Sequence, residues 1–177
     1  FGAGTRGRRE PEKSEGRALS VLPELRRAVA ADLEAMAEAE RRCFPDPWSF
    51  RLLSDLLSSS YDSVFVLASE DTLLGYVNVR VLGDEAELMR IAVVPEERGK
   101  RYGLTLLRAG LVEMCARGAE AATLEVRAGN TAAIQLYEKH GFLLAGRRKN
   151  YYEKPVEDAL IYWNRTLSVW KEEVTDA

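Results

Sequence analysis

Apolar positions recur at helical spacing over two neighbouring stretches in the first third of the chain. In the first stretch, residues 30–43, one helical side carries Leu33, Met36, Ala37 and Glu40. The segment Phe44-Pro45-Asp46-Pro47 ends this helix, because proline lacks the amide donor and disfavours helical geometry in the residue before it. The helical pattern resumes at residues 48–58. We therefore predict two helices joined by an exposed elbow that carries aromatic side chains.

Runs of β-branched and apolar residues, which are typical of strands, fill much of the remaining chain. The turns Glu70-Asp71-Thr72 and Gly83-Asp84 separate three of these runs, so the pattern predicts three antiparallel strands in succession. In all, the sequence predicts seven strands, at residues 19–27, 64–67, 73–82, 86–94, 121–127, 142–151 and 158–167.

Two further helices are expected between the later strands. Residues 103–117 place Leu104, Leu107, Leu111 and Met114 on one helical face, and Gly118 is suited to end that helix. Another helix is expected at residues 131–139, ending near Gly141. The element order βααβββαβαββ contains no internal repeat. We therefore expect one α+β domain at residues 18–169, with a disordered leader at residues 1–17 and a tail at residues 170–177.

Composition narrows the classes of partner and of chemistry. The formal net charge of −3 gives no bulk attraction to nucleic acid or to a membrane surface, so a partner has to be recognised locally. The absence of a long apolar run and of a signal pattern makes the cytoplasm the expected location. Cys43 and Cys115 are expected to be buried thiols. The single histidine, His140, lacks partners for a metal site or a Ser-His-Asp triad, so we expect no metal.

A basic loop that contains glycine leads into the helix at residues 103–117. It reads Glu96-Glu97-Arg98-Gly99-Lys100-Arg101-Tyr102-Gly103. Free amide groups at a helix start, together with the positive end of the helix dipole, attract anions, and three basic side chains favour a phosphate. A solvated turn explains the same residues equally well, so the loop alone leaves both interpretations open.

The strand at residues 121–127 and the helix after it bring several polar groups close together. If Leu124 and Val126 face the core, Glu125 points from the opposite face and can enter a cleft. Asn130 is suited to cap the following helix, on which Tyr137 shares its face. Taken singly, Tyr137 is typical of a core aromatic and Glu125 of a surface carboxylate. Their combination favours a functional site.

Four segments together resemble the GCN5-related N-acetyltransferases and, within that family, the RimI-type ribosomal-protein-alanine N-acetyltransferases of bacteria. They are Met89-Arg90-Ile91-Ala92-Val93, RGKRYG, LEVRAGNTAAIQLYEKHGF and GRRKNYYEKPVEDALI. The first two are shared by the wider superfamily, whereas the last two are close to the RimI-type pattern. The resemblance covers residues 25–167.

This resemblance implies a fold and a donor. The fold is a mixed, mostly antiparallel seven-stranded sheet that is splayed at its centre and has helices on both faces, and the donor is acetyl-CoA. The backbone of Ile91, Ala92 and Val93 pairs with the pantetheine arm, and Val93 also polarises the thioester carbonyl. The remaining donor contacts implied are Arg98, Gly99, Lys100, Arg101, Tyr102, Gly103 and Asn130.

The same resemblance implies the catalytic groups and the acceptor. Glu125 is the general base that deprotonates the acceptor amine, and Tyr137 is the general acid that protonates the departing thiolate. The acceptor is the N-terminus of a protein, expected to be the alanine terminus of a small-subunit ribosomal protein. Its first residues are held by Phe44, Trp48, Tyr151 and Tyr152.

One position departs from the phosphate loop of the superfamily. Arg101 stands where the first glycine is usual. Glycine tolerates a positive φ and a close backbone approach, which an arginine resists, although its guanidinium can reach a phosphate instead.

Two other functions remain open at this point. A small-molecule amine acetyltransferase shares the donor half of the site, and only the elbow and the last segment favour a peptide acceptor. A non-catalytic acyl-CoA-binding or ribosome-associated module is suggested by the altered loop and by the basic run Arg147-Arg148-Lys149. The presence of both Glu125 and Tyr137 argues against that module.

Overall fold

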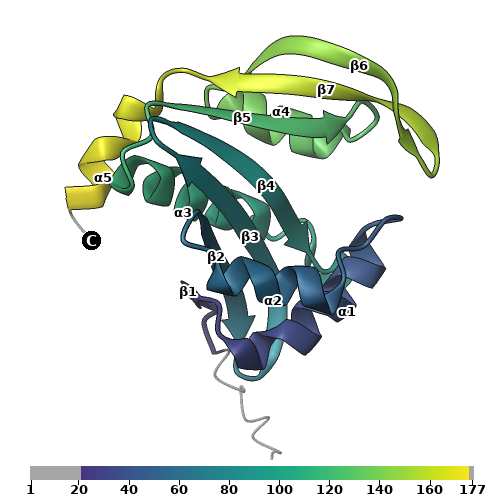
Figure 1. The fold of residues 1–177 in the computed structure, drawn as a ribbon. Helices are drawn as coiled ribbons and strands as arrows, with labels where there is room; N and C mark the ends of the chain where they lie inside the picture. The colour runs from purple at the N-terminus through teal and green to yellow at the C-terminus, as the bar shows by residue number, and fades with distance from the viewer. Residues whose placement is uncertain (1–20, 176–177) are drawn as a thin grey trace, which may run out of the picture.

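A computed structural model describes residues 21–175 of the chain (Figure 1). Its seven strands form one sheet in the order β1-β2-β3-β4-β5-β7-β6, with helices on both faces. The predicted fold class and the predicted order of strands and helices are confirmed. The leader expected at residues 1–17 lies outside the described residues.

The elements lie close to their predicted positions. The strands are β1 (Glu24–Arg27), β2 (Asp62–Ser69), β3 (Thr72–Leu82), β4 (Glu85–Val93), β5 (Ala121–Arg127), β6 (Leu143–Glu153) and β7 (Val156–Asn164). The helices are α1 (Leu33–Cys43), α2 (Phe50–Ser58), α3 (Tyr102–Ala116), α4 (Thr131–Lys139) and α5 (Lys171–Thr175), with 3-10 turns at Ala30–Asp32, Pro95–Glu97 and Leu167–Trp170. None of the helices in residues 21–175 is long and apolar enough to cross a membrane.

The end of the chain differs from the expected pattern. The last strand ends at Asn164 rather than at residue 167, because Leu167 begins a 3-10 turn and is fully buried. Part of the expected tail forms α5, and Trp170 and Val174 pack against the main core.

The centre of the sheet is split between β4 and β5. These two strands run parallel to each other. They pair only where Glu85–Glu87 of β4 lie beside Ala121–Thr123 of β5. Beyond that point they diverge, as Figure 1 shows. A bulge at Met89 bends β4, since Leu88 pairs with Val79 but Arg90 pairs with Asn78. Beyond Glu87, the edge of β4 that faces β5 is therefore left without a partner strand among residues 21–175.

Separate apolar clusters hold the helices on the two faces of the sheet. On one face α3 buries Leu107, Leu111 and Met114, as predicted, while Leu104 is only half-buried and Leu106 takes the deeper position. On the other face α1 and α2 pack on β2, β3 and β4 through Met36, Leu53, Val66 and Tyr76. Each fully buried side chain of this size contributes about 1.5–3 kcal/mol.

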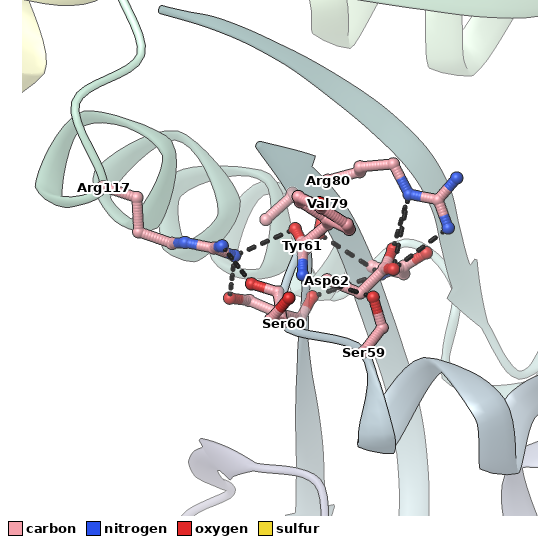
Figure 2. Close-up of polar contacts among 9 residues, drawn as sticks. Ser59, Ser60, Tyr61, Asp62, Val79, Arg80 and Arg117 are labelled. Carbon is pink, nitrogen blue, oxygen red and sulfur yellow. Dashed lines mark hydrogen bonds and ion pairs between the residues drawn. The ribbon is translucent and has the colours of Figure 1, made fainter. Parts of the chain in front are cut away.

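A polar network ties the turn before β2 to α3 (Figure 2). Arg117, which follows α3, donates to the carbonyl oxygens of Ser60 and Tyr61 at 2.6 and 3.0 Å. At the first residue of β2, the buried carboxylate of Asp62 pairs with Arg80 of β3 at 3.0 Å. A buried carboxylate is costly unless it is paired, so these contacts fix the start of β2 against both β3 and α3.

Candidate active site

The open edge of β4 presents backbone groups toward the gap between β4 and β5. The amide of Val94 donates to the carbonyl of Leu74 on β3 at 3.0 Å. Because successive residues of a strand face opposite edges, the amides of Val93 and Ile91 point away from β3 and into the gap. An extended ligand that lies along β4 can pair with these amides as an added strand would.

A cavity of about 240 Å³ occupies this gap. Residues Leu88–Ile91 of β4 and Leu124–Arg127 of β5 form its two sides, and Tyr137 of α4 also lines it. The predicted base and the predicted acid, Glu125 and Tyr137, are therefore brought to one cavity beside the open edge of β4.

A second cavity, of about 700 Å³, continues from the first. The shared lining includes Leu88, Met89, Arg90 and Glu125. The outer walls of the larger cavity are the elbow at Pro45 and Asp46 and the tip of the β6–β7 hairpin at residues 151–154. Glu125 thus lies where the smaller cavity, between β4 and β5, meets the larger cavity, between the elbow and the hairpin tip.

The alternation predicted for β5 is confirmed. Leu124 and Val126 are buried in the core, whereas Glu125 lies on the opposite face with 26% of its side chain exposed. Its carboxylate Oε1 lies 3.4 Å from a guanidinium nitrogen of Arg148 on β6. The carboxylate is therefore oriented by one neighbour and remains open to the cavities.

Helix α4 carries Tyr137 into the smaller cavity. Asn130 caps this helix as predicted, its side-chain oxygen accepting from the amide of Ala133 at 3.3 Å. The ring of Tyr137 packs edge to face on Phe142 with centroids 5.9 Å apart. Burial raises the pKa of Tyr137 to about 12, so the phenol keeps its proton at neutral pH. We find no hydrogen bond to this hydroxyl within residues 21–175, which leaves it able to donate to a ligand.

The loop before α3 contains two left-handed residues. Gly99 has φ +81° and Arg101 has φ +66°. The expectation that Arg101 resists a positive φ is therefore wrong: the loop keeps the left-handed turn with an arginine in the glycine position. Arg98 turns back and donates through Nε to the carbonyl of Val93 at 3.2 Å, which fastens the loop to the end of the open strand. The amides in the first turn of α3 have no partner within the helix and can receive an anion.

The aromatic elbow is less exposed than predicted. Phe44 and Trp48 are both half-buried, because the guanidinium of Arg90 lies 3.7 Å from the ring centroid of Phe44 and 4.5 Å from that of Trp48. A cation over an aromatic face is attracted by the ring quadrupole. The rings are therefore fixed to β4, and Phe44 lines the smaller cavity whereas Trp48 lines neither of the two cavities.

The two cysteines differ from each other. Cys115 is buried as predicted, but Cys43 is only half-buried because it lines the smaller cavity. Its Sγ lies 3.5 Å from the carbonyl oxygen of Val93. Burial raises the pKa of the Cys43 thiol, so it is neutral at physiological pH.

The tip of the β6–β7 hairpin faces the elbow across the larger cavity. Tyr151 and Tyr152 pack edge to face with centroids 5.1 Å apart, and Arg127 lies 4.1 Å from the ring centroid of Tyr152. Arg127 also lies 3.8 Å from Asp46 of the elbow, so one guanidinium bridges the two walls.

In the basic run of this hairpin, Arg147 pairs with Asp158 at 2.6 Å and Arg148 with Glu125.

Three charged residues of this region were not predicted. Glu40 and Arg90 form a buried ion pair with a nitrogen to oxygen distance of 2.5 Å, and Glu87 lines the larger cavity. The sequence holds a signal for the pair, since Glu40 falls within an apolar helical face and Arg90 interrupts an apolar strand. Glu87 and Glu125 line the same cavity, and burial together with the charge of Glu125 raises the pKa of Glu87.

Comparison with known proteins gives one family. The model of the acetyltransferase (GNAT) family matches residues 33–142. The [ribosomal protein bS18]-alanine N-acetyltransferase of Escherichia coli (strain K12) is 37% identical over 132 residues, which cover 73% of this chain and 88% of that protein.

Solved structures agree with this result. The crystal structure of the ribosomal-protein-S18-alanine N-acetyltransferase from Escherichia coli superposes with a TM-score of 0.75 at 32% identity, covering 82% of this chain and 95% of that one. The PaiA N-acetyltransferase from Thermoplasma acidophilum, solved in complex with coenzyme A, shares the fold, with a TM-score of 0.69 at 21% identity and coverage of 81% and 98%.

The raised pKa of Glu87 predicts a pH-dependent gain in stability for Glu87→Gln. A carboxyl whose pKa is raised by folding binds its proton more tightly in the folded chain, so the folded state loses stability as pH rises from the ordinary carboxyl pKa through the raised one. Glu87→Gln should therefore melt on the order of 1–3 °C above the wild-type chain at pH 7. The difference should vanish near pH ~3, well below the ordinary glutamate pKa of about 4.3, where the carboxyl is protonated in both states.

Thermal unfolding of both chains at the two pH values checks this. Glu85→Gln, an exposed site on the same strand, is the matched control and should not change the melting temperature. An equal melting temperature at pH 7, or a difference that persists unchanged in acid, would contradict the placement of Glu87 beside Glu125.

Proposed function

The chain belongs to the acetyltransferase (GNAT) family, and we propose that it acetylates the α-amine at the N-terminus of a protein, namely the terminal alanine of ribosomal protein bS18. It is an N-acetyltransferase that uses acetyl-CoA. The observation that carries the proposal is the convergence of Glu125 and Tyr137 on the cavity beside the open edge of β4.

The donor-binding residues suit a long ligand with an anionic end. The amides of Ile91 and Val93 are placed for the pantetheine arm, with Ala92 between them facing β3. The left-handed loop from Arg98 to Gly103 offers backbone amides and three basic side chains for the phosphates. Asn130, at the start of α4, lines the smaller cavity between β4 and β5. When bound, acetyl-CoA supplies the thioester whose acetyl carbon is attacked.

Glu125 acts on the acceptor side of the reaction. A terminal α-amine has a pKa of about 7.7–8.0, so most of it is protonated at neutral pH and cannot attack a carbonyl. Glu125 accepts that proton, directly or through one water, as the amine nitrogen approaches the acetyl carbon. Its position in the lining of both cavities supports this role.

Tyr137 acts on the leaving group. As the carbon–sulfur bond breaks, the electron pair goes to sulfur, and the phenol donates its proton to the thiolate. The amide of Val93 can stabilise the negative charge that develops on the carbonyl oxygen. The nitrogen loses a second proton to solvent as the amide forms, and Tyr137 regains from solvent the proton that it gave to sulfur. The products are therefore an N-acetylated terminus, free CoA thiol and one net proton, which Glu125 returns to solvent.

The acceptor cavity favours a chain terminus over a compact amine. It extends for about 700 Å³ between the elbow and the hairpin, with Pro45 and Asp46 on one side and Tyr151 and Tyr152 on the other. A peptide gains contact from successive residues along such a channel, whereas a small amine fills only its inner end. The names of the relatives in Escherichia coli support the same acceptor.

Removing either catalytic group should slow turnover. Glu125→Gln and Tyr137→Phe are each expected to lower kcat by about 10²-fold or more, the scale of a lost acid or base. Both changes keep the side-chain shape, so the fold and the KM for acetyl-CoA should be retained. Glu120→Gln and Tyr61→Phe, exposed and outside both cavities, are matched controls for steady-state assays. Near-normal turnover in both active-site variants would remove the assignment.

Arg101→Gly should preserve donor binding. A left-handed arginine costs on the order of 1 kcal/mol, and glycine relieves this while it adds flexibility to the unfolded chain, so stability should change little. The KM for acetyl-CoA should stay within about threefold, a change below 1 kcal/mol. Arg101→Ala, which keeps the backbone strain but loses the guanidinium, is the comparison. A rise of about tenfold or more in the glycine variant would show that the guanidinium itself is needed.

The acceptor is tested by direct competition. A peptide with the N-terminal residues of bS18 should be acetylated at its α-amine, located by mass spectrometry, with kcat/KM at least ~10²-fold above that for spermidine. The same peptide with a blocked terminus is the control and should remain unmodified. Faster acetylation of spermidine would favour the small-molecule function, and no acetylation of any amine would favour a non-catalytic module.

A further inference from the structure

Arg90 links the strand that borders the donor to the wall that borders the acceptor. It lies on β4 between the bulge at Met89 and the open-edge residue Ile91. It lines both cavities, and only 15% of its side chain is exposed. A long charged side chain placed here has to be held by specific partners, because burial of an unpaired charge is costly.

The main partner of Arg90 is Glu40 of α1. Two guanidinium nitrogens of Arg90 donate to the two carboxylate oxygens of Glu40, at 3.0 and 2.5 Å, in a bidentate pair. The hydroxyl of Tyr76 also donates to this carboxylate, and Glu40 is fully buried. Burial lowers the pKa of Arg90, but the bonds to Glu40 outweigh that effect and the guanidinium stays charged.

The same pair also fixes the elbow. Arg90 stacks on Phe44 and Trp48 and donates to the carbonyl oxygen of Asp46 at 3.3 Å. The second carboxylate oxygen of Glu40 accepts from the backbone amide of Trp48 at 2.8 Å. Three contacts from Arg90 of β4 and one from Glu40 of α1 therefore hold a turn that contains two prolines and has no regular structure of its own.

We propose that Arg90 is the positioning residue of the acceptor wall: held by Glu40, it fixes the elbow through Phe44 and Trp48. The elbow residues that line the larger cavity, Pro45 and Asp46, are thereby held at the distance from β4 that the acceptor terminus requires. This inference rests on the proposed function. Arg90 itself does not take part in proton transfer. Since the anchored wall and the open edge lie on one strand, the acceptor is aligned with the thioester by the same β4 that binds the donor.

Arg90→Lys is the variant that separates positioning from general stability. Lysine keeps a positive charge beside Glu40 but loses the planar fork and the flat face that stacks between two rings. The KM for the bS18 peptide should rise about tenfold or more, while kcat and the KM for acetyl-CoA stay within about twofold. Arg41→Lys, the same change in an exposed ion pair of α1, is the control and should alter none of these values.

A double variant tests whether Arg90 acts through the elbow. Trp48→Ala alone should also raise the peptide KM, and Arg90→Lys should add less than about twofold in the Trp48→Ala background, because the wall is already lost. Independent, multiplicative effects would overturn the proposal. So would an unchanged peptide KM in Arg90→Lys, or an equal rise in the KM for acetyl-CoA.

A double variant that removes both charges of the Glu40–Arg90 pair tests the proposal if a single variant fails to fold. Arg90→Met alone leaves a buried carboxylate without its cation, whereas the combined change Glu40→Gln and Arg90→Met removes both charges. If the pair folds, as near-ultraviolet circular dichroism would report, its peptide KM should rise as in Arg90→Lys, and a normal KM would overturn the proposal. Failure of the wild-type chain to acetylate the peptide would instead overturn the proposed function. The wild-type assay therefore distinguishes that outcome from a failure of the Arg90 proposal.

Discussion

The site depends on a sheet that stops pairing at its own centre. An interior strand normally has partners on both edges, and buried amides left without partners are costly. Here β4 and β5 pair over three residues and then separate, so the amides of Ile91 and Val93 face the gap instead of a strand, and Ile91 lines the cavity there. The unpaired edge is tolerated because a ligand can supply the missing hydrogen bonds. We propose that donor binding completes the sheet, and the proposed catalytic side chains, Glu125 and Tyr137, border the same gap.

The rest of the fold keeps the gap open and gives it fixed walls. Two apolar clusters hold the helices against the two faces, so that the halves of the sheet cannot close on each other. The proposed acceptor side is built from the irregular elbow and from the tip of the β6–β7 hairpin, where β6 ends at Glu153. Glu40 and Arg90 fix the elbow, and Arg127 lies between Asp46 and Tyr152 at the other wall. Charged side chains thus hold both walls.

Much of this arrangement could be predicted from local sequence, and the remainder depends on contacts between distant residues. The period of apolar positions located the strands and helices, and the alternation of β5 placed Glu125 on the cavity side. The pairing of Glu40 with Arg90 could not be read in the same way, since the two residues lie 50 positions apart and meet only when α1 packs on β4. The half-buried state of Phe44 and Trp48 follows from that pair. The left-handed conformation of Arg101 was also missed, because local preference alone disfavours it.

The central claim is that bound donor pairs with the open edge of β4. Backbone amide hydrogen exchange, followed by NMR with and without saturating CoA, tests this most directly. Exchange at Ile91 and Val93 should slow markedly when CoA binds, while Ala92, whose amide faces β3, should be protected in both states. Unchanged exchange at Ile91 and Val93 in the CoA-bound protein would contradict the account.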